Sequence, residues 1–277
     1  MIHFTSDLHY GYGPAGDKAT RALAGALERQ ERRDVLILAG DIATGDAQLR
    51  KCLALFDGFP GYKLALPGNH DVWTETGDSN ERRGRVTAIF KEAGFHPLAE
   101  EPLVVNGIGF AGCMGWYDYS FRDESLGISV AAYRAKRYPK DLRHVWADVD
   151  YVHWGRGDEE VTIEEAHALG SQLARLTRDG VREIVVATHF LPTSRLLFHP
   201  RKLVPELWRF MNVYLGSTRF EEVVRRYPRV RLAVCGHSHT ARLARIGATT
   251  YLSIGGGYEG KELVTSDGQR ITRQAFS

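Results

Sequence analysis

The sequence predicts an α/β fold. Short apolar runs typical of buried strands alternate with segments whose apolar residues recur at helical spacing, over residues 1–93 and again from about residue 162. Between these parts, the apolar stretches 103–105 and 108–110 flank Asn106-Gly107, a dipeptide suited to a tight hairpin turn. We therefore expect a mixed sheet rather than an all-parallel one.

Strands and helices are expected to alternate in the first part of the chain. The expected strands are residues 1–6, 35–39 and 62–66, and the expected helices are about 17–31, 46–56 and 79–93. Residues 35–39 are continuously apolar (Val-Leu-Ile-Leu-Ala), which is typical of a strand covered on both faces.

The same alternation returns after residue 160. Thr162 and Glu165 have the spacing of a capping box and predict a helix to about 178, followed by a strand at 183–187. A second box, Thr218 to Glu221, predicts a helix that ends before Pro228. A strand is expected at 230–234, and the tail (241–246, 249–254 and the turn 266–268) is expected to form antiparallel strands.

Composition indicates an ordinary globular protein. The 277 residues carry a net charge of +2 from 36 basic and 34 acidic residues, so no overall field points to nucleic acid or an anionic membrane. Three widely spaced cysteines without CxxC spacing predict reduced core residues in a cytoplasmic protein. No membrane span or signal peptide is visible. A single domain over 1–277 is expected, with an aromatic-rich excursion at about 114–160.

Five polar clusters follow expected strands, and their side chains have the chemistry of metal ligands. The candidates are Asp7, His9, Asp41, Asn69, His189, His237 and His239. Carboxylates and imidazoles together suit Mn, Fe, Zn or Co, and seven groups suit two ions that share a ligand. Two such ions can hold a hydroxide between them and hydrolyse a phosphoester. Two divalent ions bring four positive charges, and Asp7, Asp41 and a bridging hydroxide remove three of them. Because Asn69 is a neutral ligand, one net positive charge is left to meet a phosphate anion.

Each cluster also has an ordinary structural interpretation. Gly40-Asp41 is a common turn, Asn69-His70-Asp71 suits a loop or a helix cap, and His189 suits a buried core histidine. Only the His237/His239 pair reads first as metal ligands when taken alone. Five such clusters in one chain, each behind a strand, make coincidence a poor explanation.

The order of these clusters resembles the calcineurin-like metallophosphoesterase superfamily. Its pattern is DxH, GD, GNH followed by Asp or Glu, a lone His and GHxH, and all five parts are present from Asp7 to His239. The resemblance implies two mixed sheets packed as a sandwich and flanked by helices, with two metals at one edge. The protein phosphatases of the superfamily have Arg before GNHE, where this chain has Pro67, so a small phosphodiesterase or phosphatase is the better match.

The resemblance also implies a role for each candidate. One metal would be held by Asp7, His9, Asp41 and His239, and the second by Asp41, Asn69, His189 and His237. Asp41 would bridge the two ions. His70 would donate a proton to the leaving group, with Asp71 hydrogen-bonded to it.

Substrate choice is less clear from the sequence. The aromatics Trp116, Tyr117, Tyr119 and Phe121 either stack on an organic group or form a satellite hydrophobic cluster. The basic residues of 133–144 and Arg195 either contact substrate or belong to a solvated surface. The leading prediction is hydrolysis of a small phosphoester such as a nucleotide. A nuclease and a non-catalytic metal-binding scaffold remain as alternatives.

Overall fold

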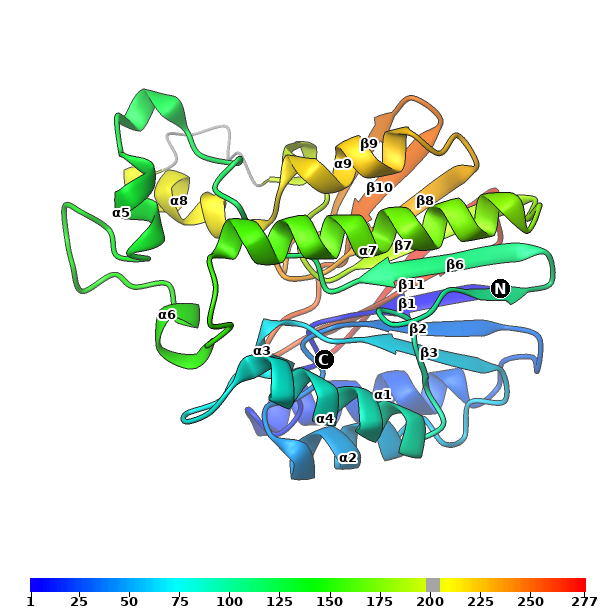
Figure 1. The fold of residues 1–277 in the computed structure, drawn as a ribbon. Helices are drawn as coiled ribbons and strands as arrows, with labels where there is room; N and C mark the ends of the chain where they lie inside the picture. The colour runs from blue at the N-terminus through cyan, green and yellow to red at the C-terminus, as the bar shows by residue number, and fades with distance from the viewer. Residues whose placement is uncertain (198–204) are drawn as a thin grey trace.

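Two six-stranded β-sheets face each other in the computed structural model, which describes residues 1–197 and 205–277 (Figure 1). The first sheet has the order β12-β11-β1-β2-β3-β4 and the second has the order β5-β6-β7-β8-β10-β9. Both sheets are mixed. In the first, β1, β2 and β3 are parallel and β11 pairs antiparallel with β1. In the second, β6 and β7 are parallel, β5 pairs antiparallel with β6, and β9 pairs antiparallel with β10. The expected α/β sandwich of two mixed sheets is confirmed.

The strands lie close to the expected positions. The first sheet contains β1 (Ile2–Thr5), β2 (Val35–Ala39), β3 (Tyr62–Leu66), β4 (His96–Pro97), β11 (Lys261–Ser266) and β12 (Ile271–Phe276). The second contains β5 (Leu103–Val105), β6 (Ile108–Cys113), β7 (Glu183–Thr188), β8 (Val230–Cys235), β9 (Arg242–Ile246) and β10 (Thr249–Ser253). Apolar side chains of both sheets, including Phe4, Ile37, Phe110 and Val234, form the core between them.

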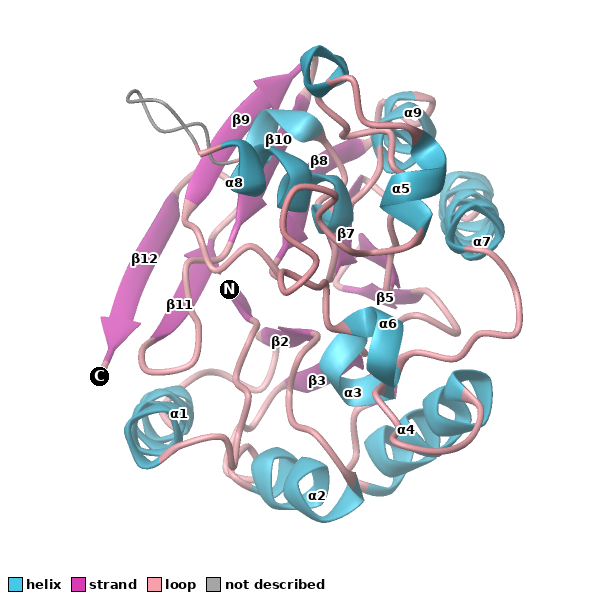
Figure 2. Cartoon of the chain, turned by 90° about the vertical axis from the view of Figure 1, so that its left-hand side faces the viewer, coloured by secondary structure: helices cyan, strands magenta, loops and turns pink. Residues whose placement is uncertain are grey.

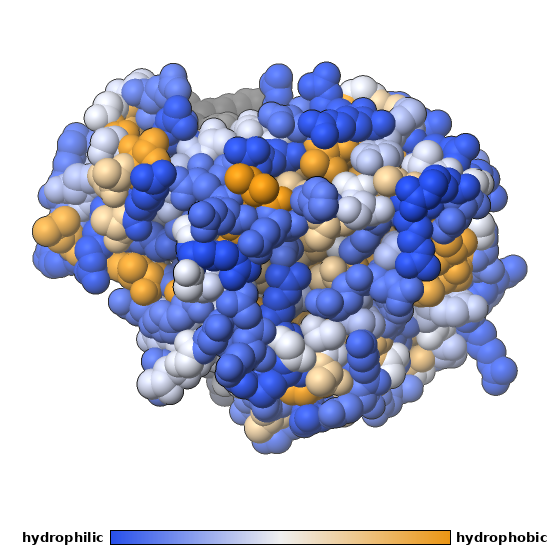
Figure 3. All heavy atoms as spheres, viewed as in Figure 1, coloured by the Kyte–Doolittle hydropathy of each residue, from blue (hydrophilic) through white to orange (hydrophobic). Residues whose placement is uncertain are grey.

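Helices cover the outer faces of the sandwich. On the first sheet lie α1 (Pro14–Leu27), α2 (Asp46–Ala54) and α4 (Ser79–Glu92); on the second lie α7 (Asp158–Arg178) and α9 (Thr218–Arg225) (Figure 1). No helix among residues 1–197 and 205–277 has both the length and the apolar character needed to cross a membrane. The face in Figure 3 is mostly hydrophilic, with apolar residues in small separate patches.

Two details differ from the sequence-based expectations. Helix α7 begins at Asp158 rather than Thr162, because Glu160 caps the Gly157 N–H while the Thr162 hydroxyl donates to a carbonyl inside the helix. Helix α9 is capped by Ser217, one residue before the expected threonine. The expected antiparallel strands of the tail do form, as β9 paired with β10 in the second sheet and β11 paired with β12 in the first.

The excursion forms a separate layer at one end of the sandwich. At this end lie α5 (Val130–Arg134) and α6 (Asp148–Tyr151) of the excursion, together with α8 (Glu206–Met211) (Figures 1 and 2). The excursion also contains η1 (Glu124–Leu126), η3 (Asn212–Leu215) follows α8, and η2 (Ser194–Leu196) contacts β9 and β10. Parallel strands β1, β2 and β3, and likewise β6, β7 and β8, end at this same end. The carboxyl ends of these strands therefore face the excursion, and the polar clusters that follow β1, β2, β3, β7 and β8 meet there.

Candidate metal centre

The loops that carry the site leave their strands through a rare backbone conformation. Five of the candidate residues have positive φ: Asp7 (56°), His9 (41°), Asp41 (52°), His237 (66°) and His239 (51°). Each such non-glycine residue costs about 1–3 kcal/mol. The loops offset this cost by binding one another, since the Asp7 N–H donates to Gly40 O at 3.0 Å and the His9 N–H donates to Asp41 O at 2.9 Å. Residues in this conformation supply donors to both groups of potential metal ligands described next.

Gly68 is required because the chain passes very close to Asp41. A Cβ at this position would lie 2.2 Å from Asp41 Oδ1 and 2.4 Å from the Asp41 backbone nitrogen. The backbone of Gly68 itself is extended, with φ of −106°. Glycine is therefore needed here for close approach rather than for a left-handed turn. Directly after it, α3 (Asn69–Val72) begins, and it carries Asn69 and His70.

Asp7, His9 and His239 form the first group of potential metal donors. The Nε2 atom of His239 lies 3.2 Å from Asp7 Oδ1 and 3.2 Å from His9 Nε2. One ligand atom from each residue lies within 4.8 Å of the others. Asp41 adjoins the group, with its Oδ2 atom 3.7 Å from His9 Nε2.

Asp41, Asn69, His189 and His237 form the second group. The Nε2 atom of His189 lies 3.3 Å from Asp41 Oδ2, 3.2 Å from Asn69 Oδ1 and 3.2 Å from His237 Nδ1. Asp41 is thus within reach of both groups.

The outer hydrogen bonds of the two histidines identify the atoms that would bind a metal. His189 Nδ1 donates to the Ala39 carbonyl at 2.9 Å, and His237 Nε2 donates to the Tyr214 carbonyl at 3.3 Å. Each ring must be neutral to bind a metal, and in that form its lone pair points inward, toward Asp41 and the Asn69 oxygen. Four acceptor atoms therefore converge on one point, and a cation is the group that would satisfy them. The donor set fits a divalent metal.

Charge and burial act in opposite directions within this centre. Burial lowers the pKa of His9 to about 4 and that of His237 to about 3, which keeps both imidazoles neutral. Burial also disfavours charge on His189, but the Asp41 and Asp7 carboxylates outweigh it and raise the pKa of His189 to about 9. The buried carboxylates thus attract positive charge to the place where the donor atoms meet.

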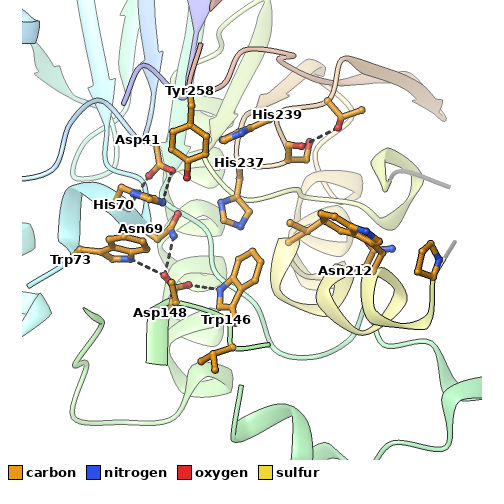
Figure 4. A pocket seen from close by; sticks show the side chains of 17 residues that line it. Asp41, Asn69, His70, Trp73, Trp146, Asp148, Asn212, His237, His239 and Tyr258 are labelled. Atoms are coloured by element: carbon orange, nitrogen blue, oxygen red, sulfur yellow. Dashed lines mark hydrogen bonds and ion pairs between the residues drawn. The ribbon is translucent and has the colours of Figure 1, made fainter. Parts of the chain in front are cut away.

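His70 lies at the edge of the centre and faces the pocket (Figure 4). Its Nε2 atom is 4.0 Å from Asp41 Oδ2, and its ring stacks on Trp73 with centroids 3.7 Å apart. The backbone N–H of His70 donates to Asp41 Oδ1 at 2.9 Å.

Asp71 has a different set of partners from the one expected. Its carboxylate accepts from the backbone N–H groups of Ile42 (3.0 Å), Ala43 (3.0 Å) and Gly68 (2.8 Å). Within the described structure, the expected hydrogen bond to His70 is not formed. One turn of α3 directs Asp71 inward, where it ties the loop after β2 to the loop after β3 and so holds Asp41 in place.

A pocket of about 750 Å³ opens directly from the metal centre. Besides the polar residues of the centre, aromatic and apolar side chains line it: Trp73, Trp146, Pro205, Trp208, Leu215 and Tyr258. Tyr258 covers the centre from the other side, with its ring stacked on His9 at 4.4 Å between centroids. The sequence offered one signal for Tyr258, the run Gly255-Gly256-Gly257 that precedes it.

The four aromatics singled out in the sequence do not line this pocket. Trp116, Tyr117, Tyr119 and Phe121 are buried, and the first three form a hydrophobic cluster with Phe190 and Tyr214. The satellite-cluster interpretation is confirmed for these three, and Phe121 packs under α7 and α9 instead. The excursion contributes other side chains, Trp146 and Asp148, to the pocket wall.

The basic segment 133–144 is a surface of paired charges. Arg134 pairs with Glu159, Lys136 with Asp158, Lys140 with Glu206 and Arg143 with Asp141. Arg195 is exposed and is not among the residues that line the pocket. These contacts match the solvated-surface interpretation rather than a site for a polyanion.

Fold and site together define a class of protein: the chain belongs to the calcineurin-like phosphoesterase family, whose sequence profile matches residues 1–241. The family is named for phosphoester hydrolysis.

The chain is also similar to individual phosphoesterases of known sequence or structure. The chain is 25% identical over 283 residues to acyl-carrier-protein phosphodiesterase PptH of Mycobacterium tuberculosis, and the match covers 91% of this chain and 76% of the relative. The crystal structure of the phosphopantetheinyl hydrolase PptH from the same organism is similar, with a TM-score of 0.70 at 23% identity over 93% of this chain and 89% of the other. A dimetal phosphatase from Danio rerio shares the fold with a TM-score of 0.59 at 12% identity, covering 100% and 95% of the two chains.

Proposed function

We propose that this protein hydrolyses phosphodiesters at a centre of two divalent metal ions that share Asp41. The convergence of acceptor atoms around Asp41 carries this proposal. Asp41 Oδ2 lies 3.7 Å from His9 Nε2 and 3.3 Å from His189 Nε2, and each histidine belongs to its own donor group.

We assign the residues to the two ions as the family resemblance implies. Asp7, His9, Asp41 and His239 would hold one ion, and Asp41, Asn69, His189 and His237 the other. Nitrogen and oxygen donors of this kind suit Mn, Fe, Zn or Co. Two such ions, when bound, supply an activated water nucleophile and offset the charge of the phosphate.

His70 is the candidate general acid. Hydrolysis forms a bond between phosphorus and the water oxygen and breaks the bond to the leaving-group oxygen, which then needs a proton. The Nε2 atom of His70 faces the centre, 4.0 Å from Asp41 Oδ2, and Trp73 holds the ring by stacking. His70 would hold this proton at Nε2 and donate it as the bond breaks.

The pocket supports a diester with a bulky organic arm. Its walls are largely aromatic, and its volume of about 750 Å³ exceeds what a phosphate group alone would fill. PptH is named as a phosphodiesterase of acyl carrier protein and as a phosphopantetheinyl hydrolase. We therefore propose a phosphodiester that carries an elongated arm of this kind as the substrate class. The nuclease alternative is less well supported, because four basic residues of 133–144 are ion-paired and the aromatics that precede them are buried.

Metal reconstitution followed by a substrate screen tests this function. The metal-free protein is incubated with Mn²⁺, Zn²⁺, Fe²⁺ or Co²⁺ and assayed against bis(p-nitrophenyl) phosphate, monoesters, nucleotides, DNA, RNA and a phosphopantetheinylated carrier protein. We expect metal-dependent turnover of diesters, highest for the carrier-linked arm. A metal-binding protein that hydrolyses none of these esters would favour the scaffold alternative, and preferred cleavage of DNA or RNA would favour the nuclease.

A further inference from the structure

A buried carboxylate lies beneath the pocket and takes no part in the mechanism above. Asp148, at the start of α6, is 1% exposed. It accepts side-chain hydrogen bonds from Asn69 Nδ2 (2.9 Å), Trp73 Nε1 (2.8 Å) and Trp146 Nε1 (2.8 Å), which Figure 4 shows. A fourth comes from Tyr117 Oη (3.2 Å). All four donors are neutral, and no cationic side chain pairs with Asp148 in the described parts of the chain.

The first of these bonds selects one orientation of the Asn69 amide. An ionised carboxylate can only accept hydrogen bonds, so Asp148 must face the amide nitrogen of Asn69. The opposite side of the amide, Oδ1, then faces His189 Nε2 at 3.2 Å. A rotated amide would bring two oxygen atoms together and turn N–H groups toward the metal centre. Asp148 thereby presents the only Asn69 atom that can bind a cation, and its charge increases the basicity of that oxygen.

Hydrogen bonds from two tryptophans connect the Asp148 carboxylate to His70, the candidate general acid, and to the pocket wall. Trp73 donates to Asp148 and stacks on His70 with centroids 3.7 Å apart. Trp146 donates to the second carboxylate oxygen and lies edge-on to His237, 5.7 Å between centroids. One side chain of the excursion therefore holds a metal ligand, the support of His70 and part of the substrate pocket.

We propose that Asp148 is a positioning residue that orients Asn69 for metal binding and Trp73 for support of His70. This proposal rests on the metal-dependent function proposed above. It assigns the excursion a role in building the metal centre, in addition to shaping the pocket.

Two matched variants test the proposal. Asp148→Asn keeps the size of the side chain but replaces an acceptor oxygen with a donor group. Asp158→Asn is the control, because Asp158 is also buried and accepts from Trp116 Nε1 and Tyr119 Oη, but it contacts none of the candidate ligands. Both variants lose buried hydrogen bonds, so both are expected to unfold at lower temperature than the wild type.

Mn²⁺ binding to the metal-free proteins is the main measurement, by calorimetric titration. We expect Asp148→Asn to bind one of two ions about 10–100-fold more weakly, the usual effect of losing an outer partner of a ligand, while Asp158→Asn binds as the wild type does. If Asp148→Asn binds both ions normally, or if Asp158→Asn is weakened equally, Asp148 is not a positioning residue. A wild-type protein that binds no metal would instead contradict the proposed function.

A crystal structure of the metal-bound wild type tests the same point if Asp148→Asn does not fold. Asn69 Oδ1 on an ion and Nδ2 on Asp148 would support the proposal. An Asn69 amide turned away from Asp148, or an ion held without Asn69, would overturn it.

Discussion

The Nε2 atom of His189 lies 3.3 Å from Oδ2 of Asp41, although the two residues follow strands of different sheets. Both side chains are almost fully buried, with 0% and 2% exposure. This contact joins the two sheets at the metal centre, and the same Asp41 oxygen lies 3.7 Å from His9 Nε2. The tests of the site therefore begin with Asp41.

Asp41→Asn should remove the charge shared by both donor groups while preserving side-chain volume. We expect metal affinity to fall by more than the roughly 10–100-fold that losing an outer partner costs, and turnover to be abolished. Elemental analysis after equilibration with Mn²⁺ measures the metal content. Wild-type occupancy of two ions in this variant would refute the bridging role.

His70→Ala should leave the metal ligands in place and remove the proton donor. Turnover of diesters with poor leaving groups should fall by about 10²–10⁴-fold, because general acid catalysis matters most for them. Activated p-nitrophenyl esters should lose much less. Steady-state kinetics on both ester types, together with metal analysis, provide the comparison. An equal loss on both would speak against the acid role.

Gly68→Ala should disrupt the centre through steric overlap. The new methyl group would lie 2.2 Å from Asp41 Oδ1, so the loop after β2 or α3 must move. We expect a lower melting temperature and weaker metal binding. Gly84→Ala is the control, because a Cβ at Gly84 in α4 has open space and alanine is about 0.5–1 kcal/mol better than glycine within a helix. Normal metal binding by Gly68→Ala would show that the close approach is not required.

Trp208→Ala should weaken binding of substrates with a large apolar arm. Trp208 lines the pocket and is 63% exposed, so its ring is free to cover an arm that enters. KM for an elongated diester should rise about 5–30-fold, the effect of losing 1–2 kcal/mol of apolar contact. KM for a small diester should hardly change. Leu142→Ala, an exposed residue outside the pocket lining, is the control. An equal change in KM for both substrates would show that Trp208 does not contact the apolar arm.

His3 should make folding stability depend on pH. Burial lowers its pKa below the ordinary value, although Asp34 partly opposes the shift, so the folded protein resists protonating His3. The unfolded chain takes up this proton near pH 6.5. The folded state therefore binds fewer protons, and the stability contribution present above about pH 6.5 is lost as the pH falls below it.

Urea unfolding of wild type and His3→Gln at about pH 7.5 and about pH 5.5 measures this effect. The fall in free energy of unfolding should be larger for the wild type. The other histidines are present in both proteins, so their contribution cancels when the two falls in the free energy of unfolding are compared. An equal fall in both proteins would show that His3 is not responsible.

Local sequence determined the strands and the ligand positions. Residues 35–39 and 62–66 are strands with the predicted bounds, because short, mainly apolar runs between turn residues are a local signal. Asp41 and Asn69 follow these strands directly, and parallel strands bring their carboxyl ends to one edge. The candidate ligands could therefore be identified without knowing how the two sheets meet.

Tertiary structure decided the partners of each side chain. Asp71 is adjacent to His70 in sequence, but the turn of α3 directs it to backbone N–H groups of the loop after β2. Asp148 lies 79 residues from Asn69, in a segment without periodicity, so nothing local marks it. Of the two interpretations of Trp116 and its aromatic neighbours, the structure confirms burial, and Tyr258 instead covers the centre. Apolar patterning marks which residues are strand or helix, but hydrogen-bond partners distant in sequence depend on how the layers are assembled.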